Sequence, residues 1–143
     1  VIAQIGADNL RGKLSITQAA SDSDDASYQA FASAYTAAGG DPAAPYAAHG
    51  YDVAFLMALA IEKAGSADRS KISAALRAVA GPTGEVVRPG EWAKAKALIA
   101  AGKDVNYEGA AGPNDFDANG DVTGLFSLNV VGADGKWSRE MIK

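Results

Sequence analysis

The sequence predicts an α/β fold that is rich in helices, with a short strand near its start and a β-hairpin at its end. Apolar residues recur at helical spacing through the middle of the chain. Near the N-terminus, and again after Phe126, they alternate with polar residues as in strands. Because the predicted helices outnumber the strands on which they should pack, we expect an incomplete portion of a larger fold, whose other strands precede Val1.

The first predicted element is a strand over residues 12–17, which leaves a turn at Asn9 to Gly12 and becomes β-branched towards its end. A helix follows the acidic run Ser21 to Asp25, because side-chain oxygens there can accept hydrogen bonds from the free N–H groups of a first turn. Its aromatic residues recur at helical spacing, at Tyr28, Phe31 and Tyr35. Gly39-Gly40 ends the helix.

The second predicted helix runs from Tyr46 to Ala64, ends at Gly65 and is apolar nearly all round. Such a helix must be covered on several sides, and this chain offers too few partners for it. We expect Tyr46 to belong to the core. An uncovered apolar face would also favour self-association of the chain.

A third helix is predicted after Ser66 or Asp68 and ends at Gly81-Pro82, and Val86-Val87 then forms a small strand. The fourth helix covers residues 91–101. Two strands over 126–131 and 136–142 form the hairpin, with Ala133-Asp134-Gly135 as its turn.

Composition limits the classes of function. The chain has 143 residues, of which 48% are apolar and 21% charged, which is typical of about one globular domain. The net charge of -4 and the scattered Lys and Arg residues speak against a nucleic-acid partner. The absence of cysteine excludes disulfides, thiolate metal sites and a cysteine nucleophile.

The longest apolar run, Val53 to Ile61, is too short for a membrane span. Since the chain starts without Met or a charged leader, we expect an interior start.

The segment Asp115 to Asp121 resembles a calcium loop, with oxygen side chains also at Asp117 and Asn119. An EF-hand loop started at Asp115 needs a bidentate Glu at its twelfth position, where this chain has Phe126. A turn is the competing interpretation, because Asp, Asn and Gly are turn formers. We therefore expect no metal and no cofactor, and keep a calcium-binding module as an alternative.

An ordered set of short motifs runs through most of the chain. They are Asp41-Pro42, Tyr46, Tyr51-Asp52-Val53-Ala54, Glu62-Lys63-Ala64-Gly65, Gly84-Glu85, Ala100 with Gly102-Lys103-Asp104, Tyr107-Glu108-Gly109, Phe116-Asp117, Asn119-Gly120-Asp121 and Gly124. In this order they resemble the C-terminal part of a periplasmic solute-binding protein of the branched-chain amino acid type, with the type I periplasmic-binding-protein fold. No single motif is decisive, and the resemblance lies in the ordered set.

The resemblance implies two α/β lobes joined by three crossing strands, with the ligand held between the lobes. Residues 1–19 would be the end of the second lobe and a hinge-crossing strand. Residues 20–124 would be the helical part of the first lobe. Residues 125–143 would make the last hinge crossing and the C-terminal hairpin of the second lobe.

Two ligand-binding residues are predicted. Tyr51 matches a tyrosine that lines the cleft in this family, and its ring and hydroxyl suit an aliphatic ligand with a polar end. A tyrosine packed at a helix start is the alternative. His49, the single histidine, lies two residues earlier on the same edge, although the family does not fix a histidine there and a structural role is open.

The function implied by the resemblance is capture of a small organic solute, most simply an aliphatic or branched-chain amino acid, in the periplasm. Its partners would be the permease subunits of an ABC importer, without nucleic acid and without a membrane span. A ligand-sensing regulatory domain of the same fold is an alternative. The sequence contains no nucleophile paired with a base, so we expect no enzyme.

Overall fold

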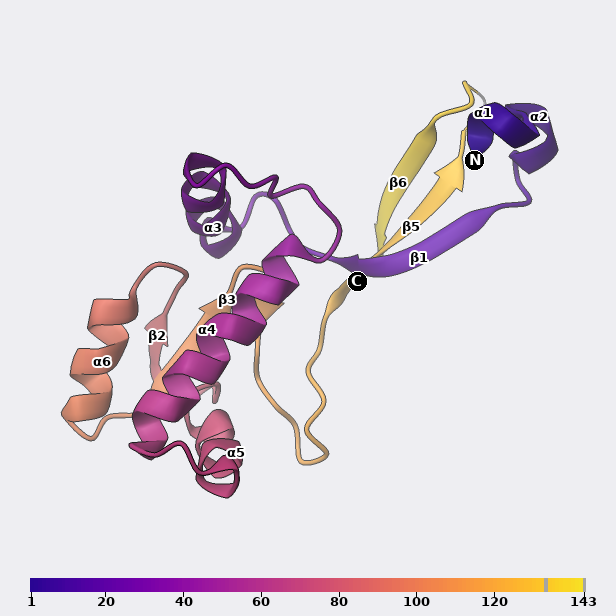
Figure 1. Ribbon diagram of the computed structural model, residues 1–143. Coiled ribbons are helices and arrows are strands. Elements are labelled where there is room, and N and C mark those ends of the chain that lie inside the picture. The colour runs from indigo at the N-terminus through magenta and orange to yellow at the C-terminus, as the bar shows by residue number, and fades with distance from the viewer. Residues whose placement is uncertain (133, 143) are drawn as a thin grey trace. The chain divides into compact units, whose positions relative to one another are not determined.

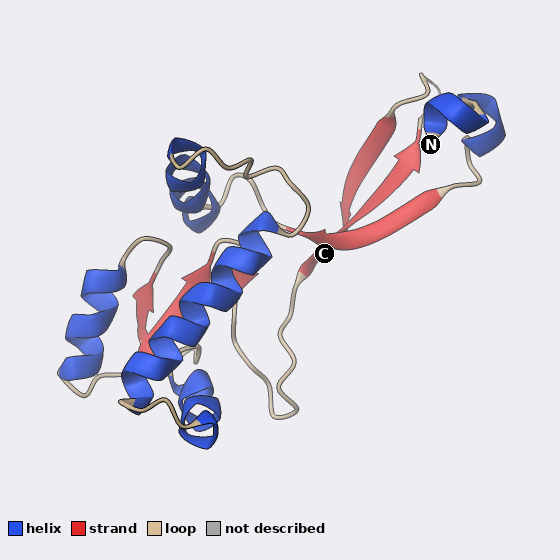
Figure 2. Cartoon of the chain, in the orientation of Figure 1, coloured by secondary structure: helices blue, strands red, loops and turns tan. Residues whose placement is uncertain are grey.

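The computed structural model describes residues 1–132 and 134–142, and its elements appear in Figures 1 and 2. The chain divides into two compact units, which we describe separately. Unit 1 consists of Val1–Ala20 and Gly124–Lys143, and unit 2 of Ser21–Thr123. The assignment of these segments to two lobes of a binding protein stays a prediction.

Unit 1 is built on a three-stranded antiparallel sheet in the order β1-β5-β6. Its strands are β1 (Ser15–Ala20), β5 (Leu125–Val131) and β6 (Trp137–Ile142), and two short helices precede them, α1 (Ile2–Ile5) and α2 (Ala7–Leu10). The predicted C-terminal hairpin is confirmed, and Ala133 of its predicted turn lies outside the described residues.

The predicted N-terminal strand starts later than expected, at Ser15 instead of Gly12, and continues to Ala20. The reason is the turn that follows α2. The backbone N–H groups of Lys13 and Leu14 both donate to the carbonyl oxygen of Leu10, so these residues are held in a turn.

Unit 2 contains a short parallel strand pair with four helices packed around it. β2 (Glu85–Val87) runs parallel to β3 (Val105–Gly109), and β4 (Gly112–Pro113) pairs with β3 in the antiparallel sense. The helices are α3 (Ala26–Ala37), α4 (Ala47–Ala64), α5 (Arg69–Ala78) and α6 (Trp92–Ala100). The long helix α4 contacts α5, α6 and β3 (Figure 1).

Side-chain caps explain where two of these helices begin. The carboxylate of Asp25 accepts hydrogen bonds from the backbone N–H groups of Ser27 and Tyr28 at the start of α3. Asp68 does the same at the start of α5. Gly65 ends α4 in the left-handed conformation, with φ 55°. All four predicted helices are present, and the helix-rich α/β class is confirmed.

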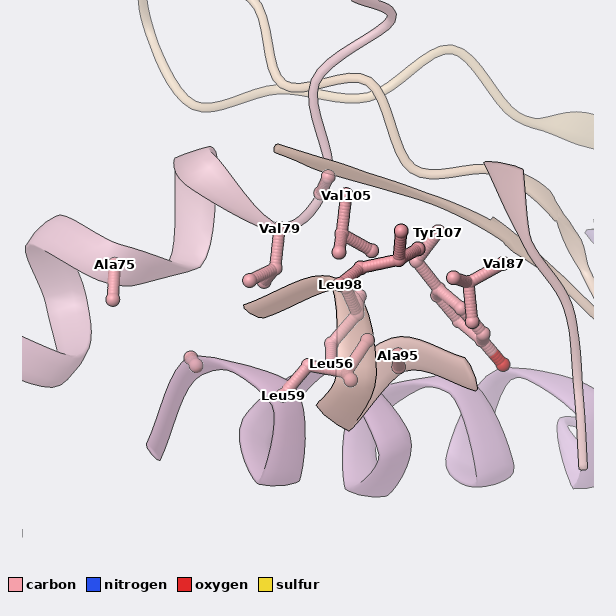
Figure 3. Close-up of a cluster of buried hydrophobic side chains, with 11 residues drawn as sticks. Leu56, Leu59, Ala75, Val79, Val87, Ala95, Leu98, Val105 and Tyr107 are labelled. Atoms are coloured by element: carbon pink, nitrogen blue, oxygen red, sulfur yellow. The ribbon is translucent and has the colours of Figure 1, made fainter. Parts of the chain in front are cut away.

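The main hydrophobic core lies between α4 and the strand pair. Leu59 of α4 and Tyr107 of β3 are fully buried, and Leu56 is nearly so. Figure 3 shows this cluster, to which α5 and α6 add Ala75 and Leu98. A smaller cluster joins Phe31 of α3 to the start of α4.

The opposite face of α4 is not covered by the described residues. Val53, Met57 and Ile61 follow one another at turn spacing and are 66%, 46% and 43% exposed. The expectation that this chain offers too few partners for α4 is therefore confirmed. The prediction that Tyr46 lies in the core is wrong, because its side chain is 57% exposed.

The strands β3 and β4 were not predicted. Val105, Asn106 and Tyr107 of β3 are all buried, so the strand is covered on both faces. Val105 to Glu108 do alternate apolar and polar residues, but a run of four is at the lower limit of length at which alternation indicates a strand. Two residues of β4 are too few to carry a pattern.

Candidate functional site

The candidate site is the edge of unit 2 where the two parallel strands end. In open α/β sheets ligands bind outside the carboxyl ends of the strands. Here β2 is followed by residues 88–90, and β3 by the tight turn 109–112. Hydrogen bonds to Tyr51 and Asp52 bring residues 46–52, at the start of α4, to both strand ends. We call these three segments together the carboxyl edge.

Tyr51 joins α4 to the end of β2. Its hydroxyl oxygen accepts a hydrogen bond from the backbone N–H of Gly90 at 3.1 Å. Its half-buried ring lies against Phe31, with ring centroids 5.2 Å apart, and stacks on Phe55 at 5.8 Å. Because a phenol is both donor and acceptor, the O–H that accepts from Gly90 keeps its own proton to donate.

His49 lies in the same first turns of α4 as Tyr51 and is half buried. Its ring meets the ring of Tyr46 edge to face, with centroids 5.8 Å apart. The structure therefore brings both predicted site residues to the carboxyl edge. That either residue contacts a ligand stays a prediction.

Tyr46 has an unusual backbone conformation. With φ 62° and ψ 9° it is left-handed, and no other non-glycine residue in the described part of the chain has a positive φ. A residue with a Cβ atom pays roughly 1–2 kcal/mol for this conformation. The conformation turns the chain into α4 and leaves an exposed aromatic ring beside His49.

Asp52 joins α4 to the end of β3 and is only 3% exposed. Oδ1 accepts hydrogen bonds from the Tyr107 hydroxyl and the Ala110 N–H, each at 2.8 Å, and Oδ2 accepts from the Ala111 N–H at 2.7 Å. Burial raises the pKa of this carboxyl above its usual value of 3.8. The three hydrogen bonds and the nearby charge of His49 act in the opposite direction and are smaller.

The role of Asp52 was missed from the sequence, where it was only one residue of a motif. A signal was present, since a carboxylate on the buried side of an otherwise apolar helix needs a buried partner. The partner that the structure shows is Tyr107, whose own pKa is raised, first by burial and then by the charge of Asp52.

The Asp115–Asp121 segment forms a turn around Asp117. One carboxylate oxygen of Asp117 accepts from the backbone N–H groups of Asn119, Gly120 and Asp121 at 2.8 to 2.9 Å. Arg77 donates to the carbonyl oxygen of Asp117 at 2.6 Å. Residues 1–132 and 134–142 contain no group of three or more His, Asp or Glu side chains that could hold a metal ion. The geometry of this segment is thus that of an Asx turn.

Within the part of the chain that the structure describes, no helix has the length and apolar character needed to cross a membrane.

Comparison with known proteins identifies a family and a curated relative. Residues 6–131 match the model of the receptor family ligand binding region. The chain is 35% identical over 103 residues to the chemotactic signal transduction system substrate-binding protein BasB of Halobacterium salinarum. This match covers 71% of the chain and 25% of BasB, so the chain spans about a quarter of the length of that relative. No solved structure matches the sequence significantly.

Proposed function

Because the chain belongs to the receptor family of ligand-binding regions, with a type I periplasmic-binding-protein fold, we propose that it serves in an extracytoplasmic solute-binding protein. The solute is a small organic molecule, and the carboxyl edge of unit 2 contributes to its site. One observation carries this proposal: the start of α4 makes direct hydrogen bonds to the segments that follow both parallel strands. Ligands of α/β folds bind at such strand ends.

The chemistry of the edge favours an aliphatic amino acid, with branched-chain amino acids as the first class to test. Tyr51 offers an apolar ring with a hydroxyl at its tip, and His49 adds a polar ring beside it. In this proposal Tyr51 and His49 contact the solute, and the protein is not an enzyme.

The bound solute would pass to the permease subunits of an ABC importer. A sensing role is a second candidate, favoured by one observation: the relative BasB is named as a substrate-binding protein of a chemotactic signal transduction system. Both roles use the same binding step and place the protein outside the cytoplasm.

The test is calorimetric titration of the protein that contains this chain with L-leucine, L-isoleucine and L-valine. Tyr51→Ala should weaken the binding at least tenfold, and His49→Ala should weaken it less. The matched control is Tyr35→Ala, because Tyr35 also stacks on Phe31 but lies outside the carboxyl edge. An affinity unchanged by Tyr51→Ala would remove Tyr51 from the site, and no binding of any amino acid would refute the proposed solute class.

A further inference from the structure

We propose that Asp52 is a positioning residue of the ligand site, whose carboxylate holds the turn that ends β3 in place against α4. The inference rests on the proposed function, since it assigns a task at the same carboxyl edge. Asp52 itself is buried and does not need to touch the solute.

The turn is a two-residue hairpin connection. Glu108 pairs with Pro113 and Gly109 with Gly112, so Ala110 and Ala111 are its two central residues. Their N–H groups point to separate oxygens of one carboxylate, at 2.8 and 2.7 Å. Consecutive backbone N–H groups that converge in this way form an anion-binding nest. In this chain the nest is filled by an internal anion.

The carboxylate is fixed from its other side as well. The Tyr107 hydroxyl donates to the oxygen of Asp52 that also binds Ala110. At Gly109 a Cβ atom would lie 2.5 Å from Asp52 Oδ2, so the carboxylate occupies the space that a side chain at position 109 would need. Hydrogen bonds to an ionised acceptor are about twice as strong as those between neutral groups. The turn therefore has little freedom to shift relative to α4.

Asp52 follows Tyr51 directly, and the two neighbours hold the two strand ends. Tyr51 accepts from Gly90 after β2, and Asp52 accepts from Ala110 and Ala111 after β3. One turn of α4 thus sets the spacing between the segments that follow the two parallel strands. A solute that contacts both segments depends on this spacing, because displacement of binding groups by about 1 Å is costly.

The decisive variant is Asp52→Asn, tested in the protein that contains this chain. Asparagine keeps the shape of the side chain, but its NH2 group would face a backbone N–H instead of accepting from it. We expect hydrogen exchange of the Ala110 and Ala111 amides, measured by NMR, to accelerate at least tenfold. We expect the affinity for L-leucine, L-isoleucine or L-valine to fall at least tenfold.

Tyr107→Phe is the second variant and keeps the test decisive if Asp52→Asn does not fold. It removes one hydrogen-bond donor to Asp52 and leaves the hydrogen bonds from the Ala110 and Ala111 N–H groups in place. We therefore expect smaller changes in the amide exchange rates and in the affinity. Leu98→Ala is the control, because Leu98 belongs to the same core as Tyr107 but lies on α6. Leu98→Ala should lower the melting temperature and leave the affinity unchanged. If Asp52 had a merely structural role, Asp52→Asn would give this same result.

Unchanged exchange at Ala110 and Ala111 in folded Asp52→Asn would overturn the inference. So would an affinity loss in Leu98→Ala equal to that in Asp52→Asn at the same loss of stability. If the unaltered protein binds none of the three amino acids, the proposed solute class fails. The exchange measurement still decides whether Asp52 positions the turn.

Discussion

The hydroxyl oxygen of Tyr51 accepts a hydrogen bond from the backbone N–H of Gly90, a residue 39 positions later in the chain. The ring of the same tyrosine is held separately, against Phe31 and Phe55. The two parts of this side chain therefore have different tasks, which substitutions can separate.

Tyr51→Phe is expected to free the segment after β2 and leave the aromatic packing intact. Loss of this one hydrogen bond should lower the free energy of unfolding by about 1 kcal/mol. The Gly90 amide should exchange faster with solvent, as followed by NMR. Tyr35→Phe is the control and should change neither the free energy of unfolding nor the exchange rate of Gly90. An unaltered exchange rate at Gly90 in Tyr51→Phe would contradict the hydrogen bond from Gly90 to Tyr51.

Two substitutions on α4 should separate its buried face from its exposed one. Leu59→Ala removes a fully buried side chain and is expected to lower the free energy of unfolding by about 3 kcal/mol. Met57→Ala, two positions away and 46% exposed, should change it by less than about 0.5 kcal/mol. Urea denaturation measures both. Equal losses would mean that Met57 is covered in solution, for example by a second copy of the chain.

Two glycine-to-alanine substitutions should have opposite effects on the stability of the fold. Gly109→Ala places a methyl group 2.5 Å from Asp52 Oδ2 and Asn114 Nδ2, and is expected to destabilise the fold by about 1–3 kcal/mol. Gly50→Ala in α4 meets no atom within 4 Å and should stabilise the helix by about 0.5–1 kcal/mol. Thermal unfolding of the two variants beside the unaltered protein tests this. A neutral Gly109→Ala would show that the turn adjusts freely.

The acid side of the stability curve should depend on Asp117. Hydrogen bonds from backbone N–H groups, that of Asp121 first, hold the pKa of its carboxyl below the usual 3.8. A carboxyl with a lowered pKa binds fewer protons when the protein is folded. Its stabilising effect is therefore complete above the usual pKa and is lost as the pH falls through the lowered one.

Asp117→Asn should accordingly lower the melting temperature at neutral pH and flatten its decline in acid. Scanning calorimetry from neutral to acid pH provides the measurement. Calcium should leave the melting temperature unchanged in both proteins. A rise with calcium that disappears in Asp117→Asn would restore the loop as an ion site.

Local chemistry made much of this fold predictable. Asp25 and Asp68 mark the starts of helices by capping, Gly65 marks an end, and the alternation after Phe126 marks the hairpin. Each of these signals acts within a few residues, where propensity and hydrogen bonding decide the structure.

Features that depend on distant partners could not be predicted in the same way. The strand β3 is defined by pairing with β2 and by burial on both faces, neither of which is visible in five residues. The task of Asp52 needs the turn at Ala110, which is 58 positions away. Tyr46 combines its exposed side chain with a left-handed backbone, a conformation that tyrosine seldom adopts and that the residue type does not predict.

The pairing of β1 with β5 has a consequence for biosynthesis. Ala20 pairs with Leu125, so all of unit 2 separates the two partners in the chain. Translation releases β1 first, and its edge stays unpaired until Leu125 has left the ribosome. The strand pairs of unit 2 lie wholly within its own residues and can form during this interval. The connectivity therefore allows unit 2 to fold before the β1–β5 pair of unit 1 forms.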